Sequence, residues 1–395
     1  MPSSKPRRPL TVLQLIPTLM TGGAERATID IAAALARRGD RALVGSEGGK
    51  RLLNELKAAG GEFIHMPLAW KNPVMVAANI GRIKRVIRER GVDIVHARSR
   101  APAWSAFFAC RACNVPFVTT YHGVYNETNR LKRFYNSVMV RGAIVIANSA
   151  YTADLIRARY NAPPERVVII RRSVDLARFD PSAVDAARRN ALRQQWGIGR
   201  DKRIVLNLAR LTGWKGQRVI VEAAALSPLA ARTDVVVVLA GDAQGRTKYL
   251  RELEQAVVAH DLTGRVLIVG HCDDAPAALA LADVAVIAST EPEAFGRMAV
   301  EAAAMGVPVV ATAIGATGET VLAPPHVAAG ERTGWLVPPD DPAALAEGIG
   351  AALVLSPEDR RALALRARAH AMNFSTEAMQ EATLAVYDQV MSLRG

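Results

Sequence analysis

The sequence is poor in cysteine and contains no long uncharged apolar segment. Its three cysteines are too few for a disulfide framework, so a reducing cytoplasm is the expected environment. Cys110 and Cys113 have the spacing of a metal or redox pair, but no second ligand pair accompanies them, and buried helix cysteines are the simpler interpretation. No run of about 18 apolar residues predicts a membrane-spanning helix. No apolar segment of the secretory kind follows the basic start MPSSKPRRPL, so no signal peptide is expected.

Aromatic residues are also scarce, at 5%, whereas half of the residues are hydrophobic. This composition favours helices packed on a buried parallel sheet over a β-sandwich. A chain of 395 residues is long enough for two such domains.

Positive charge is concentrated in the first half of the chain. Residues 1–185 contain 29 basic and 14 acidic residues, which gives a net charge of +15. The remainder contains 21 basic and 23 acidic residues, which gives a net charge of −2. A one-sided basic surface attracts an anionic partner, which would be nucleic acid, a membrane leaflet or a phosphorylated glycolipid.

Two series of alternating strands and helices predict an α/β fold with two Rossmann-like, doubly wound parallel-sheet domains that face a cleft. The first series opens with an apolar strand at 11–16, a loop at Gly22 and Gly23, and a helix that ends near Gly39. Its further strands are expected at 41–44, 93–97, 117–121, 143–147 and 167–170, and its further helices at 74–90, 101–111 and 151–160. The strands of the second series are expected at 204–208, 235–240, 266–269, 284–288 and 309–312.

The polar, charged segment 175–203 separates the two series and is predicted to contain the linker. We therefore place an N-terminal domain at 1–185 and a C-terminal domain at 186–372. The final segment, 373–395, is expected to form a helix that packs back on the N-terminal domain.

The strongest chemical signal is the segment 289–312, STEPEAFGRMAVEAAAMGVPVVAT. A helix that starts near Gly296 offers free backbone N–H groups and a partial positive charge to a diphosphate or a sugar oxygen. Glu293 precedes this helix and Glu301 lies inside it. Eight residues of helix rise about 12 Å, beyond the roughly 5–9.5 Å between glycosidase carboxylates. The two acids are therefore interpreted as hydroxyl binders at opposite ends of one ligand, although Glu301 alone would suggest a solvated helix residue.

Two cations, Arg210 and Lys215, follow the strand at 204–208 in the sequence ARLTGWKGQ. Open α/β sheets bind ligands at the carboxyl ends of their strands. Fixed cations there would stabilise a diphosphate leaving group, whereas two basic loop residues without that context would be surface charges.

Together these segments resemble the retaining GT-B glycosyltransferases of family four, also called group 1, over nearly the whole chain. Among them the resemblance is to enzymes that build lipopolysaccharide core and envelope polysaccharides. It includes GGAER, YHG, ANS, RLxxxKG, ADV at 282–284, two glutamates eight residues apart around AFG, and TGWLVPPDDPAALA at 333–346. It implies that 1–185 binds the acceptor and 186–372 binds a nucleotide sugar.

The resemblance also implies a role for each matching residue. Arg210 and Lys215 would hold the two phosphates, and Glu293, with the backbone N–H groups of Phe295 and Gly296, would bind the donor sugar. The remaining matches are Glu301 for the ribose hydroxyls, Gly22 and Gly23 for close approach to the phosphate, and His122 near the reacting carbon on the acceptor side.

The residue at position 297 and the segment after Glu319 depart from the family pattern. A branched apolar residue is common where Arg297 stands, so the donor contacts there are expected to differ. Glu319 matches a family glutamate, but the apparent insertion LAPPHVAAGER follows it.

The chemistry implied by the resemblance is metal-independent and retaining. No D-x-D motif suited to a metal-held diphosphate is present, so neither a metal ion nor another cofactor is expected. In the implied front-side attack, the departing phosphate helps to take the acceptor proton. The expected donor is a UDP- or GDP-hexose, and the expected acceptor is a lipopolysaccharide core or another envelope glycan or glycolipid.

Two basic segments with apolar residues suggest contact with a membrane. The helix at 74–90 carries an apolar face, and the stretch 129–142 follows His122 directly. The apolar residues concerned are Ile80, Ile83, Val86 and Ile87 in the first segment, and Phe134, Tyr135, Val138 and Met139 in the second. They either pack on the sheet or dock on an anionic leaflet, and docking would place a cytoplasmic enzyme at the inner face of the cell membrane.

Three other functions are weighed against this one. A nucleotide-sugar epimerase of the same architecture would need no acceptor, and the basic first half and the glutamate pair argue against it. A non-enzymatic nucleic-acid-binding protein would explain the charge, but no aromatic-interleaved basic motif accompanies it, so no nucleic acid partner is expected. A dinucleotide dehydrogenase is disfavoured because TGGAER is not G-x-G-x-x-G.

Overall fold

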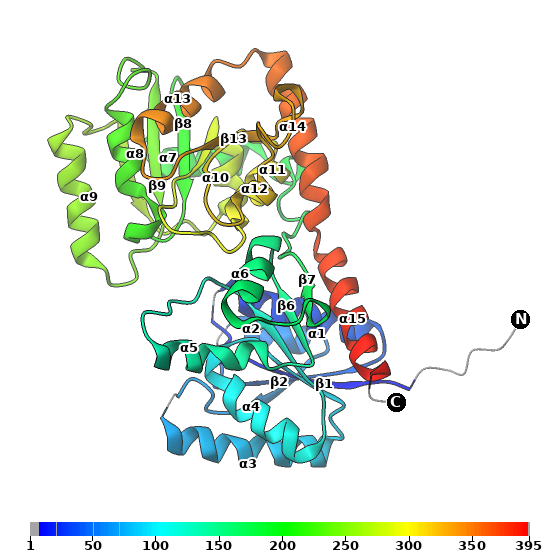
Figure 1. Ribbon diagram of the computed structural model, residues 1–395. Coiled ribbons are helices and arrows are strands. Elements are labelled where there is room, and N and C mark those ends of the chain that lie inside the picture. Colours follow the sequence, from blue (N-terminus) through cyan, green and yellow to red (C-terminus); the bar gives the residue numbers. More distant parts are fainter. Residues whose placement is uncertain (1–7, 21, 50, 71, 394–395) are drawn as a thin grey trace, which may run out of the picture. The chain divides into compact units, whose positions relative to one another are not determined.

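The computed structural model describes residues 8–20, 22–49, 51–70 and 72–393, which form two compact units (Figure 1). Unit 1 consists of the chain up to Arg172 together with the segment from Thr376 onward, and unit 2 consists of Ser173–Ser375. The division therefore falls before residue 185, and the chain returns to unit 1 through its last helix.

Unit 1 is built on a parallel sheet with the order β3-β2-β1-β4-β5-β6-β7 among the described residues. Its strands are β1 Thr11–Leu15, β2 Arg41–Ser46, β3 Glu62–His65, β4 Ile94–Ala97, β5 Phe117–Tyr121, β6 Ile144–Ala147 and β7 Val167–Ile169. Its α-helices are α1 Gly23–Arg37, α2 Arg51–Ala58, α3 Pro73–Arg90, α4 Arg100–Cys113, α5 Arg130–Asn136, α6 Ala150–Tyr160 and α15 Thr376–Ser392. Because β1 is bordered by β2 and β4, the strand order reverses between β1 and β4.

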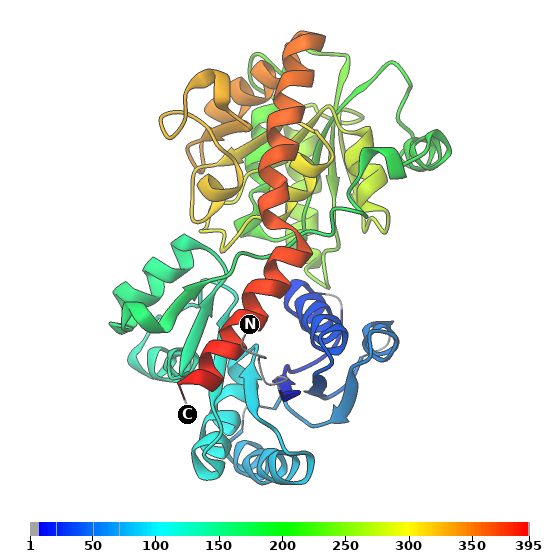
Figure 2. The ribbon, with the colours of Figure 1, turned by 90° about the vertical axis from the view of Figure 1, so that its right-hand side faces the viewer.

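Helices cover both faces of this sheet, and alternate residues of β1 enter different cores. Val12 packs in one core with Ile31 of α1 and Tyr387 of α15. Leu13 packs in the other with Ile83 of α3. Successive side chains of a strand point to opposite faces, so an apolar run such as TVLQL belongs in a sheet covered on both sides. Figure 2 shows α15, in red, beside α1.

Unit 2 repeats this plan with the order β10-β9-β8-β11-β12-β13 among the described residues. Its strands are β8 Arg203–Leu208, β9 Val235–Ala240, β10 Val266–Gly270, β11 Val284–Ile287, β12 Val309–Thr312 and β13 Gly334–Val337. Its α-helices are α7 Ala186–Gln195, α8 Gln217–Ala224, α9 Thr247–Ala259, α10 Ala275–Leu281, α11 Arg297–Ala304, α12 Thr317–Thr320, α13 Pro342–Leu353 and α14 Pro357–Ala371. The strand order reverses between β8 and β11, and this is the point where open α/β sheets bind ligands.

The predicted fold class, two Rossmann-like parallel-sheet domains, is confirmed. The segment predicted to be a polar linker, however, contains α7. Leu192 is the buried residue of this helix, and Asp185 caps it by accepting from the N–H of Arg188. A helix that buries so little gives no apolar periodicity, which is why the sequence pattern does not reveal it.

The apolar face of α3 packs inside unit 1. Ile83 and Ile87 are buried, and Ile80 and Val86 pack against the same core. Membrane docking through this face is therefore wrong, because folding already uses its apolar residues. Within the described part of the chain, no helix is long and apolar enough to cross a membrane.

Candidate active site

In unit 2 the loop after β8 presents Arg210 and Lys215 at the point where the strand order reverses. The next residue, Gly216, has a φ of +68°, and a Cβ there would lie 1.7 Å from the carbonyl oxygen of Ala288, just after β11. Glycine is therefore required for the close approach of the two loops. Gln217 Nε2 donates to the carbonyl oxygen of Arg210 at 3.0 Å and holds the other end of the loop. The Arg210 side chain is exposed.

Lys215 and Glu293 form an ion pair between the loops that follow β8 and β11. Lys215 Nζ and Ser289 Oγ both donate to Oε1 of Glu293, the latter at 2.6 Å. Only 19% of the Lys215 side chain and 9% of the Glu293 side chain are exposed. Lys215 Nζ also lies 4.2 Å from the ring centroid of Trp214. This arrangement fixes both charges and leaves further ammonium N–H groups to donate to a ligand.

A third segment, after β12, fixes the backbone of Glu293. The N–H of Ala316 donates to the Glu293 carbonyl oxygen at 2.8 Å. Gly315 has a φ of +70°, and a Cβ there would lie 2.3 Å from the same oxygen. Side chain and backbone of Glu293 are therefore held by loops from three neighbouring strands, which pre-organises the carboxylate.

The first residue of α11 lies four residues beyond Glu293. Gly296, with a φ of +81°, precedes the first helical residue, Arg297. Phe295 is buried and packs edge to face against Phe374, with ring centroids 5.5 Å apart. This packing fixes where the helix begins. The first N–H groups of a helix have no intrahelical acceptor and carry partial positive charge, so they can bind an anion or a sugar oxygen.

Glu301 is buried one turn inside α11 and pairs with Arg297, whose Nε donates to Glu301 Oε1 at 2.7 Å. Because α11 begins only at Arg297, the spacing of about 12 Å expected for eight helical residues does not describe the separation of Glu293 and Glu301. Glu319 lies on α12 and is half-buried.

In unit 1, Gly23 and His122 lie beside Arg172, which follows β7. Arg172 Nη2 lies 3.4 Å from Nδ1 of His122. A Cβ on Gly23 would come within 3.1 Å of Arg172 Nη1, so glycine leaves room for the guanidinium. Asn148, from the ANS motif, donates from Nδ2 to the His122 carbonyl oxygen at 3.3 Å. Gly22 is the N-cap of α1.

These contacts fix the protonation of His122. A guanidinium group only donates, so Nδ1 accepts from Arg172 and a neutral ring carries its proton on Nε2. Burial, together with the charges of Arg172 and Arg98, holds the pKa of His122 well below its ordinary value. Nε2 is buried and has no hydrogen-bond partner among the described residues. His122 is therefore arranged to donate a hydrogen bond from Nε2 at neutral pH.

A buried polar network surrounds the ends of β1 and β4 in unit 1. Arg98 Nε donates to Gln14 Oε1 at 2.6 Å. His96 contacts the Tyr387 hydroxyl through Nδ1 and the Thr120 hydroxyl through Nε2, both at 2.7 Å. Burial, reinforced by the charge of Arg98, lowers the pKa of His96 well below its ordinary value. Through Tyr387 this network joins α15 to the sheet.

The structure groups the candidates predicted from the sequence into two sets. Gly22, Gly23 and His122 belong to unit 1, and Arg210, Lys215, Glu293, Phe295, Gly296, Arg297 and Glu301 belong to unit 2. Sequence reasoning missed Ser289, Gly315, Arg98 and Arg172. Ser289 and Arg98 directly follow predicted strands, a position that would have flagged them.

The sequence contains two adjacent aspartate pairs, Asp273–Asp274 and Asp340–Asp341, and the second residue of each has a structural role. Asp274 binds Arg188 and caps α10, and Asp341 caps α13. Within residues 8–20, 22–49, 51–70 and 72–393, no three His, Cys, Asp or Glu side chains are grouped so that they could hold a metal ion.

Two Rossmann-like units, with a lysine–glutamate pair and a helix N-terminus at the switch point of the second, match the architecture of GT-B glycosyltransferases. The chain belongs to the family 4, group 1 glycosyltransferases: residues 21–178 match the family described as Glycosyltransferase Family 4, and residues 188–370 match Glycosyl transferases group 1.

Individual relatives agree with this assignment. The D-inositol 3-phosphate glycosyltransferase of Xylanimonas cellulosilytica is 32% identical over 76% of this chain and 73% of its own length. The crystal structure of a glycosyltransferase from Rickettsia africae has 32% identity and a TM-score of 0.87, over 98% of this chain and 99% of that one. Anabaena Alr3699/HepE, solved in complex with UDP-glucose, has 25% identity and a TM-score of 0.80, over 96% and 100% of the two chains.

Proposed function

We propose that this enzyme transfers a hexose from a UDP- or GDP-sugar to a lipopolysaccharide core or another envelope glycan or glycolipid, with retention of configuration and without a metal ion. The observation that carries the proposal is the Lys215–Glu293 pair at the β8–β11 switch point. It combines a fixed cation for the leaving group with a fixed carboxylate for sugar hydroxyls. The UDP-glucose complex of the Anabaena relative supports a nucleotide-sugar donor.

Each donor-site residue has a role that follows from its chemistry. Lys215 and Arg210 bind the diphosphate and stabilise the negative charge that grows as the sugar leaves. The N–H groups of Phe295 and Gly296 donate to the donor, and Glu293 accepts from its sugar hydroxyls. Glu301 accepts from the ribose hydroxyls at the other end of the ligand. Arg297 orients Glu301 through their hydrogen bond.

The proposed reaction proceeds at one face of the donor sugar. As the bond from the anomeric carbon to the phosphate breaks, the acceptor hydroxyl attacks from the same side and passes its proton to a phosphate oxygen. Configuration is then retained without a protein nucleophile. His122, with its proton on Nε2, donates a hydrogen bond to an oxygen of the reacting sugars and does not serve as the base.

A second candidate acceptor is a small phosphorylated polyol. The relative from Xylanimonas is named a D-inositol 3-phosphate glycosyltransferase. In unit 1, Arg172 contacts the His122 ring, and Arg98 lies close enough to lower the pKa of that histidine. Guanidinium groups beside the expected reaction point would bind an acceptor phosphate. This candidate keeps the same donor site and differs only in the acceptor.

We further propose that unit 1 docks on the inner, anionic face of the cell membrane through α4 and α5. Leu131 and Phe134 of α5 are 80% and 59% exposed, and Phe108 of α4 is 46% exposed. The rings of Phe108 and Phe134 stack on Trp104, with centroids 5.9 and 5.1 Å from it. Aromatic side chains among cations suit the interface between lipid headgroups and acyl chains.

Basic residues lie beside this apolar cluster or on the same helices; we define the cluster as Trp104, Phe108, Leu131 and Phe134. The guanidinium of Arg141 lies 5.2 Å from the Trp104 ring centroid. The basic residues of α4 and α5 are Arg100, Arg111, Arg130, Lys132 and Arg133, of which Arg100 donates to Asn136 Oδ1. Val138 and Met139, by contrast, are buried, so only part of the segment 129–142 is available for docking.

The test begins with purified protein and a panel of UDP- and GDP-sugars. We expect slow hydrolysis of one donor and faster turnover when its acceptor is added. Inositol phosphates and lipopolysaccharide-core oligosaccharides are compared as acceptors, and envelope glycans are analysed in a deletion strain. Retention is read from the anomeric configuration of the product by NMR. Release of an epimerised free sugar nucleotide would instead establish the epimerase, and salt-sensitive DNA binding without transfer would establish the nucleic-acid-binding alternative.

A further inference from the structure

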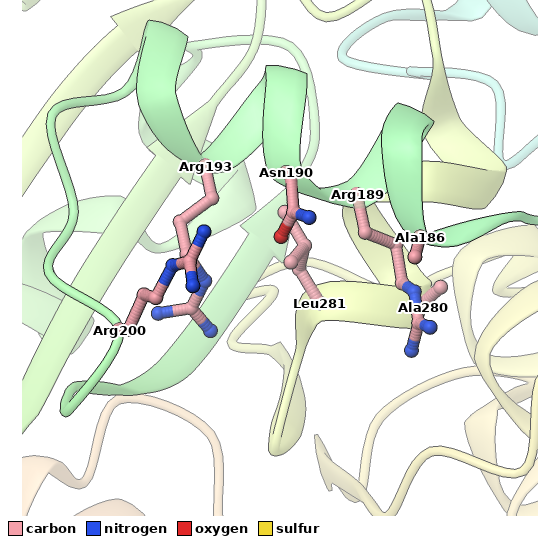
Figure 3. Close-up of a pocket in the computed structure, with 7 residues that line it drawn as sticks. All are labelled: Ala186, Arg189, Asn190, Arg193, Arg200, Ala280 and Leu281. Carbon is pink, nitrogen blue, oxygen red and sulfur yellow. The ribbon is translucent and has the colours of Figure 1, made fainter.

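Unit 2 contains a second basic site, near the amino-terminal ends of β8 and β11, opposite the candidate donor site. An open pocket of about 340 Å³ is lined by residues of α7, the loop after it and the end of α10 (Figure 3). The lining residues are Ala186, Arg189, Asn190, Arg193, Arg200, Ala280 and Leu281. Its volume lies in the range of small-molecule sites.

The pocket is separate from the donor site by topology. Arg200 precedes β8 and Leu281 precedes β11, whereas Arg210 and Glu293 follow those strands. Because β8 and β11 are neighbouring parallel strands, the two sites lie at opposite ends of the same pair. Nothing in the proposed transfer reaction uses the residues of the pocket.

Positive charge in the pocket is not balanced by nearby acids. The stretch 186–200 contains four arginines and no acidic residue. One of them, Arg188, is neutralised by Asp274 through two hydrogen bonds of 3.0 and 2.7 Å. The other three line the pocket, and in the described part of the chain no carboxylate pairs with Arg189 or Arg200. The acid next in sequence, Asp201, pairs with Lys202.

The pocket is also structured rather than a loose collection of side chains. Arg193 Nη1 donates to the carbonyl oxygens of Gly199 and Lys202, at 2.7 and 3.1 Å, which positions the guanidinium without cancelling its charge. Figure 3 shows Arg193 and Arg200 converging at one end and Arg189 at the other. Asn190 and Leu281 lie between them, so a polar amide and a small apolar surface separate two cationic ends.

We propose that this pocket binds a small soluble metabolite with two anionic groups, at least one of them a phosphate. Arg193 and Arg200 hold one anionic end, Arg189 holds the other, and Asn190 bonds to the polar body between them. The small volume of the pocket and the absence of exposed large apolar residues among its described lining residues favour a small ligand over a membrane. The proposal is independent of the proposed transfer reaction.

The test uses fructose 1,6-bisphosphate and inorganic pyrophosphate as probes, titrated calorimetrically against the full chain in 0.15 M salt. Arg189→Gln with Arg200→Gln should weaken binding of at least one probe by about tenfold or more, because each loses a charge-assisted contact. Arg193 is left unchanged because it bonds to the backbone. The matched control is Arg246→Gln with Arg251→Gln, which removes two arginines of unit 2 near and on α9 and should retain binding.

A third variant separates this pocket from the donor site. Arg210→Gln with Lys215→Ala should leave bisphosphate binding within about twofold of wild type, since both residues lie at the other end of β8 and β11. The proposal is overturned if the wild type binds neither probe at millimolar concentration, if the α9 control loses binding equally, or if only the donor-site variant loses it. Pocket-dependent binding to phosphatidylglycerol vesicles or to DNA, without binding of either probe, would also overturn it.

Discussion

Replacing either member of the Lys215–Glu293 pair tests the donor site most directly. Lys215→Ala removes the cation assigned to the leaving diphosphate, and Glu293→Gln keeps the shape of the side chain but removes its charge. Removing one pre-organised polar group that stabilises a transition state commonly costs about 10²-fold or more in turnover, or roughly 2.7 kcal/mol. We therefore expect each variant to lose about 10²-fold or more in kcat/KM.

The structure predicts smaller losses of turnover for substitutions that leave both charges of this pair in place. Ser289→Ala removes one hydrogen bond to Glu293 but neither charge, so a loss of about three- to tenfold is expected, corresponding to roughly 0.5–1.5 kcal/mol. Glu222→Gln is the control, because this α8 carboxylate pairs with the exposed Arg218 outside the site. It should leave turnover unchanged, because the pair lies outside the site. Exposed pairs also contribute only about 0–1 kcal/mol to the free energy of unfolding, so the variant should stay folded.

The assay is donor hydrolysis and transfer kinetics, with urea unfolding of the same preparations to separate folding from chemistry. The mostly buried pair also contributes to stability, and each single variant should lower the free energy of unfolding by about 1–3 kcal/mol. Near-normal turnover of both Lys215→Ala and Glu293→Gln, in protein that remains folded, would refute the assignment of the site.

Three further predictions concern the metal, the membrane and acid stability. Turnover should survive EDTA, and activity that is lost and then restored by Mg²⁺ or Mn²⁺ would show that a metal holds the diphosphate. Lys132→Glu with Arg133→Glu should weaken co-sedimentation with anionic vesicles by more than the two lost contacts of about 1 kcal/mol each, because the new charges repel the leaflet. Turnover on a soluble acceptor should be unchanged. Docking would be excluded if the wild-type protein does not bind such vesicles even at low salt. The lowered pKa values of His96 and His122 mean that the unfolded chain takes up protons below about pH 6.5 that the folded protein does not. The free energy of unfolding should therefore fall as the pH drops from 7 to 5.5, and His96→Gln should reduce this fall by up to about 1.4 kcal/mol per pH unit. An unchanged slope would mean that His96 takes up its proton over the same pH range in the folded protein as in the unfolded chain.

Sequence patterns predict the strands of this protein well because the central strands are buried on both faces. Val235–Ala240, for example, is apolar throughout, as a covered parallel strand must be. The half-exposed edge strand Glu62–His65 lacks this signal, and so does α7. Segments stabilised by a cap or a few edge contacts give little periodicity to detect.

The sequence singles out candidate site residues where the signal is a short local motif. Lys215 and Glu293 each lie in a short motif that follows a predicted strand, but β9 and β10 separate those strands in the chain, so the sequence does not predict their ion pair. The contact of Arg172 with His122 joins two segments 50 residues apart, and no local sequence pattern predicts it. The packing of α3 shows the opposite error, because an amphipathic basic helix has the same pattern whether its apolar face meets lipid or a neighbouring helix.

The return of α15 to unit 1 has a consequence for biosynthesis. Met379, Val386, Tyr387 and Val390 complete a core whose other buried residues come from the first half of the chain, and the roughly 200 residues of unit 2 lie between. At about 5–20 residues per second, a ribosome needs about 10–40 s to make that interval. During this time the nascent first half holds an uncovered apolar face, and Nδ1 of His96 lacks its partner Tyr387. Chaperone binding to stalled nascent chains should therefore be strongest for those that end within unit 2, and should decline once α15 has left the ribosome.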